Sequence, residues 1–348
     1  MRQIPGWLVL AAALASGAAL ADNLGAGNTQ PSKAAKVRFA ADFPALTDHE
    51  WGFAIGGFGG TQAGDAPGHV PVIFVHGNNV DHGDWYPVRD DFRAAGWSDQ
   101  ALWALSYNGL GANNGTALFR ENPERDAEHT EMAGDGVARV TSNDVNVPDL
   151  HDFILAVRAY TGSRKFSLVS HSLGVTLARK TLKVHPELRE DLVAFVGIAG
   201  ANDGTAFCPP GSETVVASCD QIAAGTPWLA ELNGPSGSDE TYAPARWLTV
   251  YDGSGAGDPA YPGSYAQSPR LEGADNREYP YTYHNDLRLK REIVAEYRAF
   301  LEQAEVAPKS AALAEGSGVL VGALNPLLLL ALLIAAMGRS HRRAILIG

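Results

Sequence analysis

The sequence predicts an α/β protein with a mostly parallel central sheet flanked by helices. From Val70 onward, short and uniformly apolar segments alternate with longer amphipathic ones, which is the pattern of β-α-β winding. In addition, 45% of the 348 residues are hydrophobic and only 19% are charged. Such a chain can bury a sizeable core, so wholesale disorder is excluded. We expect one folded domain over residues 69–304.

The expected strands contain no charged residue, as is typical of strands covered on both faces by helices. They lie at residues 70–75, 101–106, 166–169, 192–198 and 247–251. The expected helices lie at residues 85–95, 148–160, 173–184 and 286–302. In the second of these helices, Phe153, Ile154 and Val157 share one face, and Gly162 follows as a stop signal.

The N-terminus has the features of an export signal. Residues 1–21 contain Arg2, an apolar run and a small-residue site ending at Ala21, which together predict a signal peptide. Residues 22–68 are rich in Gly, Ala and Asn and show little periodicity, so we interpret them as an N-terminal extension. The mature protein is therefore expected outside the cytoplasm.

The C-terminus predicts a membrane or sorting segment. After a linker at residues 305–318, residues 319–337 are apolar and uncharged, and three arginines follow within residues 338–348. The apolar stretch is long enough to span a bilayer, and the arginines would stay on the cytoplasmic side. The same arrangement is similar to sorting tails that are cleaved during surface delivery. We expect residues 319–348 to anchor the exported protein in the membrane, or to be removed on secretion.

Two long segments, residues 107–143 and 200–240, are rich in Gly, Asn, Asp, Thr and Pro. They are too long for ordinary connections, so we expect lid-like insertions. The second contains Cys208 and Cys219, the two cysteines of the chain. In an exported protein these are expected to form one disulfide.

Charge and cysteine content exclude other classes of protein. With 39 acidic and 27 basic residues, the net charge is −12, which disfavours binding to nucleic acid. Two cysteines cannot supply a four-thiolate zinc site. Four residues are crowded enough to bind a metal: His76, Asp81, His82 and Asp84. Their place directly after a strand is better explained by a loop that supplies a backbone N–H donor. We expect no metal and no cofactor.

A candidate nucleophile lies between the third expected strand and the third expected helix. Here the sequence reads Ser170-His171-Ser172-Leu173-Gly174. A sharp strand-to-helix turn with small residues two positions on either side presents the central hydroxyl, here that of Ser172, above the sheet. Ser170 replaces the more usual glycine, but it is also small.

A serine hydroxyl needs an imidazole as general base, and the imidazole needs a carboxylate to orient it. Of the three histidines after Ser172, His341 follows the apolar tail and His185 ends the helix that Ser172 begins. At a helix C-terminus, His185 is explained by the helix dipole. His284 remains as the candidate base. The acid should follow the last strand, where Asp252 and Asp258 compete; Asp252 could instead cap the turn after it.

The developing oxyanion of an ester intermediate needs backbone donors. One donor is normally the N–H of the residue after the nucleophile, here Leu173. The other comes from a loop after an early central strand, and the segment Val75-His76-Gly77-Asn78 has this position. We assign the N–H of Asn78 as the second donor.

Several of these segments together resemble bacterial lipases of the α/β-hydrolase superfamily, particularly small secreted lipases. The resemblance rests on the segments 75–78, 170–174 and 271–276 and on His284 with Leu287. It implies an α/β-hydrolase fold, and the spacing of the acid, the segment at Leu271 and the histidine in that family favours Asp258 over Asp252. The chain is also similar to secreted polyhydroxyalkanoate depolymerases, which share the His-Gly-Asn loop and the small-His-Ser elbow.

These inferences predict a carboxylic ester hydrolase that works through an acyl-enzyme intermediate and needs no cofactor. The resemblance implies a water-insoluble lipid ester as substrate, with a polyester, poly(3-hydroxyalkanoate), as the alternative. A surface binding module that keeps the hydrolase scaffold without catalysis is a different class of function. The presence of all three triad residue types in the expected order argues against it.

Overall fold

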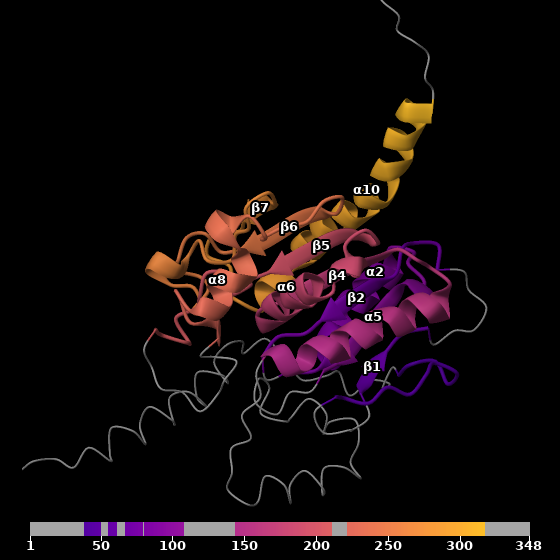
Figure 1. The fold of residues 1–348 in the computed structure, drawn as a ribbon, viewed down its shortest axis with the longest axis horizontal. Helices are drawn as coiled ribbons and strands as arrows, with labels where there is room; N and C mark the ends of the chain where they lie inside the picture. Colours follow the sequence, from indigo (N-terminus) through magenta and orange to yellow (C-terminus); the bar gives the residue numbers. More distant parts are fainter. Residues whose placement is uncertain are drawn as a thin grey trace, which may run out of the picture. The chain divides into compact units, whose positions relative to one another are not determined.

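The computed structural model describes residues 38–49, 55–60, 67–78, 80–107, 143–210 and 221–316. In these residues one seven-stranded sheet has the strand order β1-β3-β2-β4-β5-β6-β7 (Figure 1). All neighbouring strands are parallel except β1, which pairs antiparallel with β3. The mostly parallel sheet that the sequence predicts is therefore confirmed. The strands are β1 (Gly56–Phe58), β2 (Val72–Val75), β3 (Leu102–Ser106), β4 (Phe166–His171), β5 (Leu192–Ile198), β6 (Arg246–Tyr251) and β7 (Asp275–Glu278).

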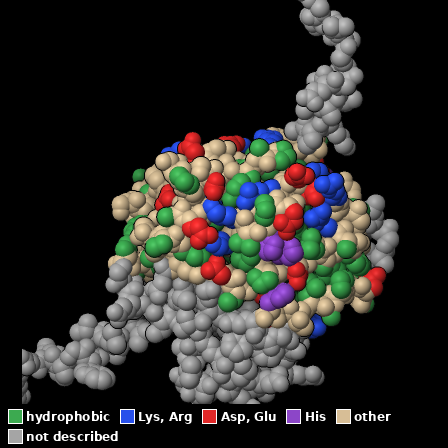
Figure 2. Space-filling view, in the orientation of Figure 1, with side chains coloured by type: hydrophobic (Ala, Val, Ile, Leu, Met, Phe, Trp, Pro, Cys, Tyr) green, Lys and Arg blue, Asp and Glu red, His purple; other side chains and the backbone are tan. Residues whose placement is uncertain are grey.

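Helices cover both faces of this sheet. The longer helices are α2 (Tyr86–Ala94), α5 (Val147–Thr161), α6 (Leu173–Val184), α8 (Pro227–Asn233) and α10 (Arg291–Gly316), with the short α9 (Asp286–Leu289) between β7 and α10. Short 3₁₀ helices are η1 (His82–Trp85), η2 (Asp99–Ala101), η3 (Asn143–Asn146), η4 (Pro186–Leu188), η5 (Pro235–Gly237) and η6 (Gly263–Tyr265). Helices α5 and α6 lie on one face, and α2 and the first part of α10 lie on the other (Figure 1). On the face with α5 and α6, basic and acidic side chains are interspersed (Figure 2).

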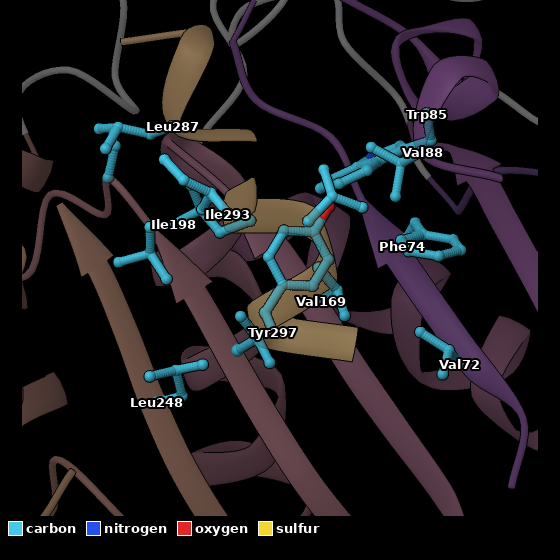
Figure 3. Close-up of a cluster of buried hydrophobic side chains, with 14 of the residues drawn as sticks. Val72, Phe74, Trp85, Val88, Val169, Ile198, Leu248, Leu287, Ile293 and Tyr297 are labelled. Carbon is cyan, nitrogen blue, oxygen red and sulfur yellow. The ribbon is translucent and has the colours of Figure 1, made fainter. Parts of the chain in front are cut away.

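The core has one apolar layer on each side of the sheet, because successive strand residues point to opposite faces. In β2, Val72 and Phe74 pack with residues of α2 and α10, whereas Ile73 and Val75 pack with residues of α5 and α6. Figure 3 shows the first layer, in which Tyr297 of α10 lies close to side chains from the strands and from α2. All four β2 residues are fully buried, as expected for a strand covered on both faces.

Local sequence signals set the ends of α5. Pro148 is at the first turn, where its missing N–H costs no helical hydrogen bond, and Gly162 follows the last turn in the left-handed conformation with φ 66°. The stop that the sequence predicts at Gly162 is thus confirmed. Within α5, Phe153, Ile154 and Val157 are fully buried.

Some elements differ from those expected. Strands β1 and β7 were not predicted, since β1 is a Gly-Gly-Phe segment within the expected N-terminal extension and β7 is a polar, partly exposed edge strand. Helix α8 lies in the long segment 200–240, where no helix was expected. The last expected helix is interrupted at Lys290, whose backbone is extended, and α10 continues to Gly316, into the segment expected as a linker.

The chain divides after Glu305 into two units, and the described part of the second is the end of α10, residues 306–316. The expected signal peptide, the C-terminal tail and most of the first lid-like insertion lie outside the described residues. Among the helices of the described residues, none combines the length and the apolar character needed to cross a bilayer.

Candidate active site

Ser172 is at a sharp turn between the end of β4 and the start of α6. Its φ of 54° and ψ of −126° are unusual for a residue other than glycine, and such a conformation costs on the order of 1–3 kcal/mol. The Ser172 N–H donates to the Ile198 carbonyl oxygen at 2.8 Å, which ties the turn to the neighbouring strand β5. The backbone therefore has the strained geometry of a nucleophile elbow.

Two glycines allow the chain to pack closely around this turn. A β-carbon on Gly174 would lie 2.3 Å from the His76 carbonyl oxygen and 2.7 Å from that of Val75. A β-carbon on Gly77 would lie 2.9 Å from the Ser172 β-carbon. The first turn of α6 and the loop after β2 thus meet at Ser172 with no room for larger residues.

We expect Gly174→Ala to lower the free energy of unfolding by about 3 kcal/mol, because the new methyl group would collide with backbone rather than with a flexible side chain. Urea denaturation measures the loss. Gly197→Ala is the comparison, since its β-carbon would approach the Val175 side chain at 3.2 Å, and it should cost clearly less. Equal stability of both variants would contradict this account of the packing.

His284 and Asp258 form a buried pair. The Asp258 Oδ2 atom is 2.7 Å from His284 Nδ1, and the two residues are 1% and 4% exposed. Because a carboxylate only accepts, Nδ1 is the donor in this hydrogen bond, and in the uncharged form of the ring Nε2 is the basic nitrogen. The other carboxylate oxygen, Oδ1, accepts from the Ala260 N–H at 2.8 Å, so the carboxylate is fixed on both sides.

His171, the residue before Ser172, links this pair to the elbow. Its ring centroid is 4.7 Å from that of His284, and its Nε2 donates to the His284 carbonyl oxygen at 3.3 Å. Burial, together with His284 and Arg288, lowers the pKa of His171 well below its usual value. His171 is therefore neutral, and a neutral ring with its proton on Nε2 can hold the loop of His284 against the end of β4.

Asp252 is engaged elsewhere. Its two oxygens accept from the N–H groups of Ser254, Gly257, Asp258 and Tyr281 and from the Ser254 hydroxyl, at 2.5–3.0 Å. Burial raises the pKa of Asp252, but these hydrogen bonds outweigh it and leave the pKa below its usual value. Asp252 thus caps the turn after β6 and shapes the loop that carries Asp258.

The loop after β2 is held from below by Tyr107, the residue that follows β3. The Tyr107 hydroxyl donates to the His76 carbonyl oxygen at 3.0 Å, and the two rings stack with centroids 4.0 Å apart. Burial lowers the pKa of His76 to about 3, so this ring is uncharged at neutral pH. Sequence reasoning missed Tyr107 because it begins a segment without a pattern.

The two predicted oxyanion donors are the N–H groups of Asn78 and Leu173. Asn78 is exposed in the turn of the loop after β2. Leu173 is the first residue of α6, where first-turn N–H groups have no helical partner.

The other polar residues after β2 have separate protein partners. Asp81 accepts from the Gly83 N–H at 2.8 Å, and His82 Nδ1 is 2.5 Å from the Ser106 hydroxyl. Asp84 is paired with Arg288 at 3.2 Å, and both side chains are buried. This ion pair joins η1 to α9, the helix that follows His284 directly. Together with His76, these residues therefore contribute to positioning the loop.

Cys208 is buried at 5% exposure, in the apolar layer that also contains residues of α2 and α10. Cys219 lies outside the described residues, so the disulfide stays a prediction.

The fold is that of an α/β-hydrolase. It has this strand order, helices on both faces of the sheet and a sharp strand-to-helix turn at Ser172. Residues 129–245, about a third of the chain, match the family model for lipase (class 2), and this segment includes the elbow. The match confirms the expected resemblance to α/β-hydrolases of the lipase and esterase type. Over this segment the chain is thus similar to class 2 lipases.

Among solved structures, the chain is similar to a membrane phospholipase A described as a bacterial virulence factor, with 15% identity, 85% of this chain and 97% of that one covered, and a TM-score of 0.48. A putative aryl esterase from Burkholderia cenocepacia is 17% identical, with coverages of 75% and 98% and a TM-score of 0.45. Lipase B of Aspergillus fumigatus is 20% identical over 63% of this chain, with a TM-score of 0.44, and the chain spans about half of its length, 49%. No curated protein matches the chain.

Proposed function

We propose that the protein hydrolyses carboxylic esters of lipids with Ser172 as nucleophile, His284 as general base and acid, and Asp258 as the orienting carboxylate. The observation that carries the proposal is the buried 2.7 Å hydrogen bond between His284 Nδ1 and Asp258, held beside a strained elbow at Ser172. This bond leaves Nε2 of His284 free to take a proton, which is what the serine hydroxyl requires.

In the first step, the Ser172 oxygen attacks the ester carbonyl carbon while His284 Nε2 takes the hydroxyl proton. The negative charge on the carbonyl oxygen is received by the N–H groups of Leu173 and Asn78. Collapse of this intermediate breaks the bond to the alcohol, which leaves with the proton from His284. Water then attacks the acyl-enzyme by the same route and releases the acid.

The buried Asp258 carboxylate stabilises the imidazolium that forms in each step, without taking its proton. In an interior that excludes water, this interaction is stronger than it would be at the surface. Because His76 and His171 are neutral, His284 would carry the positive charge in the transition state without a second charged ring beside it.

The substrate class in this proposal is a lipid ester, supported by the class 2 lipase match around the elbow. The purified full chain should therefore react with a fluorophosphonate probe at Ser172 and hydrolyse a short-chain chromogenic ester and a triglyceride emulsion. Faster release of products from poly(3-hydroxyalkanoate) granules than from either ester would instead favour a depolymerase. No labelling by the probe would favour a binding module without catalysis.

We further propose that the enzyme acts outside the cytoplasm, because residues 1–21 have the features of a signal peptide. The apolar residues 319–337 would hold it in the membrane unless they are removed. Fractionation of the producing cells, with detection of the folded domain, tests this location.

A further inference from the structure

A cluster of histidine and carboxylate side chains lies outside the candidate active site, at the other end of α6. His151 is in the second turn of α5, His185 follows the last residue of α6, and Glu187 is in η4. One ligand atom from each of these three residues can be chosen so that all lie within 4.8 Å of one another. Figure 2 shows histidine side chains at the surface of the face that carries α5 and α6.

The three side chains are connected through short contacts. The Glu187 Oε1 atom is 3.2 Å from His185 Nδ1 and 3.5 Å from His151 Nε2. The rings of His151 and His185 stack with centroids 3.8 Å apart. Residues from two segments, separated by more than thirty positions in the chain, therefore meet around a single carboxylate oxygen.

A second carboxylate fixes the tautomer of His151. Its Nδ1 atom is 2.8 Å from Asp152 Oδ1, and the other oxygen of Asp152 is 2.8 Å from His49 Nε2. Since Asp152 accepts the Nδ1 proton, a neutral His151 has its lone pair on Nε2, facing Glu187. A lone pair and a carboxylate oxygen repel each other at 3.5 Å unless a cation lies between them.

Two of the three ligand spacings fit a zinc ion as this cation, and the third, between the two histidine nitrogens, is no more than 4.8 Å. Tetrahedral Zn²⁺ with bonds of about 2.0–2.1 Å holds its ligand atoms about 3.3–3.4 Å apart. The two contacts of Glu187 Oε1 with the histidine nitrogens, 3.2 and 3.5 Å, bracket this value. Histidine that donates its second nitrogen proton to a carboxylate is the usual arrangement in zinc sites.

We propose that His151, His185 and Glu187 bind one Zn²⁺ ion or a similar divalent transition metal, with Asp152 orienting His151. The side chains of His185 and Glu187 are 25% and 59% exposed, so they can rotate to aim at a common point and leave a fourth position for water. This gives His185 a role beyond the helix dipole.

The proposed metal has a structural role. Helix α6 has 12 residues and is about 18 Å long, and it begins at Leu173, directly after Ser172, whereas His185 is at its far end. The ion would join the start of α5 to the end of α6, and so stabilise the layer on which the elbow is built. Its binding should raise the unfolding temperature and leave ester hydrolysis largely unchanged.

The test is titration of the purified full chain, without a histidine tag and freed of metal by a chelator, with Zn²⁺ and Co²⁺ at neutral pH. We expect one ion to bind with a micromolar or lower Kd, the visible spectrum of tetrahedral Co²⁺, and an unfolding temperature higher by about 3 °C or more. His151→Gln and His185→Gln should each weaken binding at least about tenfold, and Asp152→Asn by about tenfold.

The matched control is His69→Gln. His69 Nδ1 also contacts a carboxylate, Glu305, at 3.0 Å, but it belongs to no three-ligand group in the described part of the chain. This variant should bind Zn²⁺ as the parent chain does. Absence of saturable binding, or binding that both His151→Gln and His185→Gln leave unchanged, would overturn the proposal. The first result would mean that a proton alone fills the gap between His151 and Glu187.

Discussion

Ser172→Ala should lower kcat for ester hydrolysis by about 10⁴-fold or more, because it removes the hydroxyl oxygen that we propose as the nucleophile. Alanine meets the same strain as serine at φ 54°, and the Ser172 N–H bond to Ile198 involves only backbone. The free energy of unfolding should therefore change little. Hydrolysis of a chromogenic acyl ester and urea denaturation measure the two quantities on the same preparation.

Ser167→Ala is the matched control for this loss. Ser167 is also a buried serine of β4, and its hydroxyl has no hydrogen-bond partner in the described structure. Removing that hydroxyl should leave kcat within about threefold of the parent value, since Ser167 is at the opposite end of the strand. Undiminished turnover in Ser172→Ala, or an equal loss in Ser167→Ala, would exclude Ser172 as nucleophile.

The elbow could be predicted because its signal is local. An apolar strand, a small-His-Ser-x-Gly turn and an amphipathic helix follow one another within 20 residues, and β4 (Phe166–His171) and α6 (Leu173–Val184) lie where expected. By contrast, β1 and β7 have three and four residues with no apolar alternation. They are strands because β3 and β6 offer open edges, and this information is in the partner strand rather than in their own sequence.

The roles of Asp252 and Asp258 could not be separated from the residues alone. Both follow β6 within seven positions, and only the path of the loop decides which carboxylate meets His284. The loop turns back because Asp252 accepts the N–H groups of Gly257 and Asp258, which directs the Asp258 side chain toward His284. Similarly, no sequence spacing indicates that His151 and His185 stack, since α5 and α6 bring them together only in three dimensions.

The second large effect is expected for Asp258→Asn, which should lower kcat by about 10³–10⁴-fold. An asparagine side chain has no charge to stabilise the imidazolium of His284. It can also present its NH₂ group to Nδ1, which would move the ring proton to Nε2 and remove the base that Ser172 needs. KM for a short-chain ester should change much less than kcat, because the Asp258 carboxylate is buried and paired with His284.

Asp252→Asn separates catalysis from loop structure. This variant weakens hydrogen bonds to a charged acceptor, so it should lower the free energy of unfolding by about 2 kcal/mol, with a smaller loss of kcat than in Asp258→Asn. The folded-state pKa of Asp252 is below that of an unfolded aspartate. Its stabilising contribution is therefore complete above about pH 4 and is lost as the pH falls through the folded pKa. The stability difference between Asp252→Asn and the parent chain should shrink in the same range. If Asp252→Asn loses more kcat than Asp258→Asn at equal stability, the triad carboxylate is Asp252.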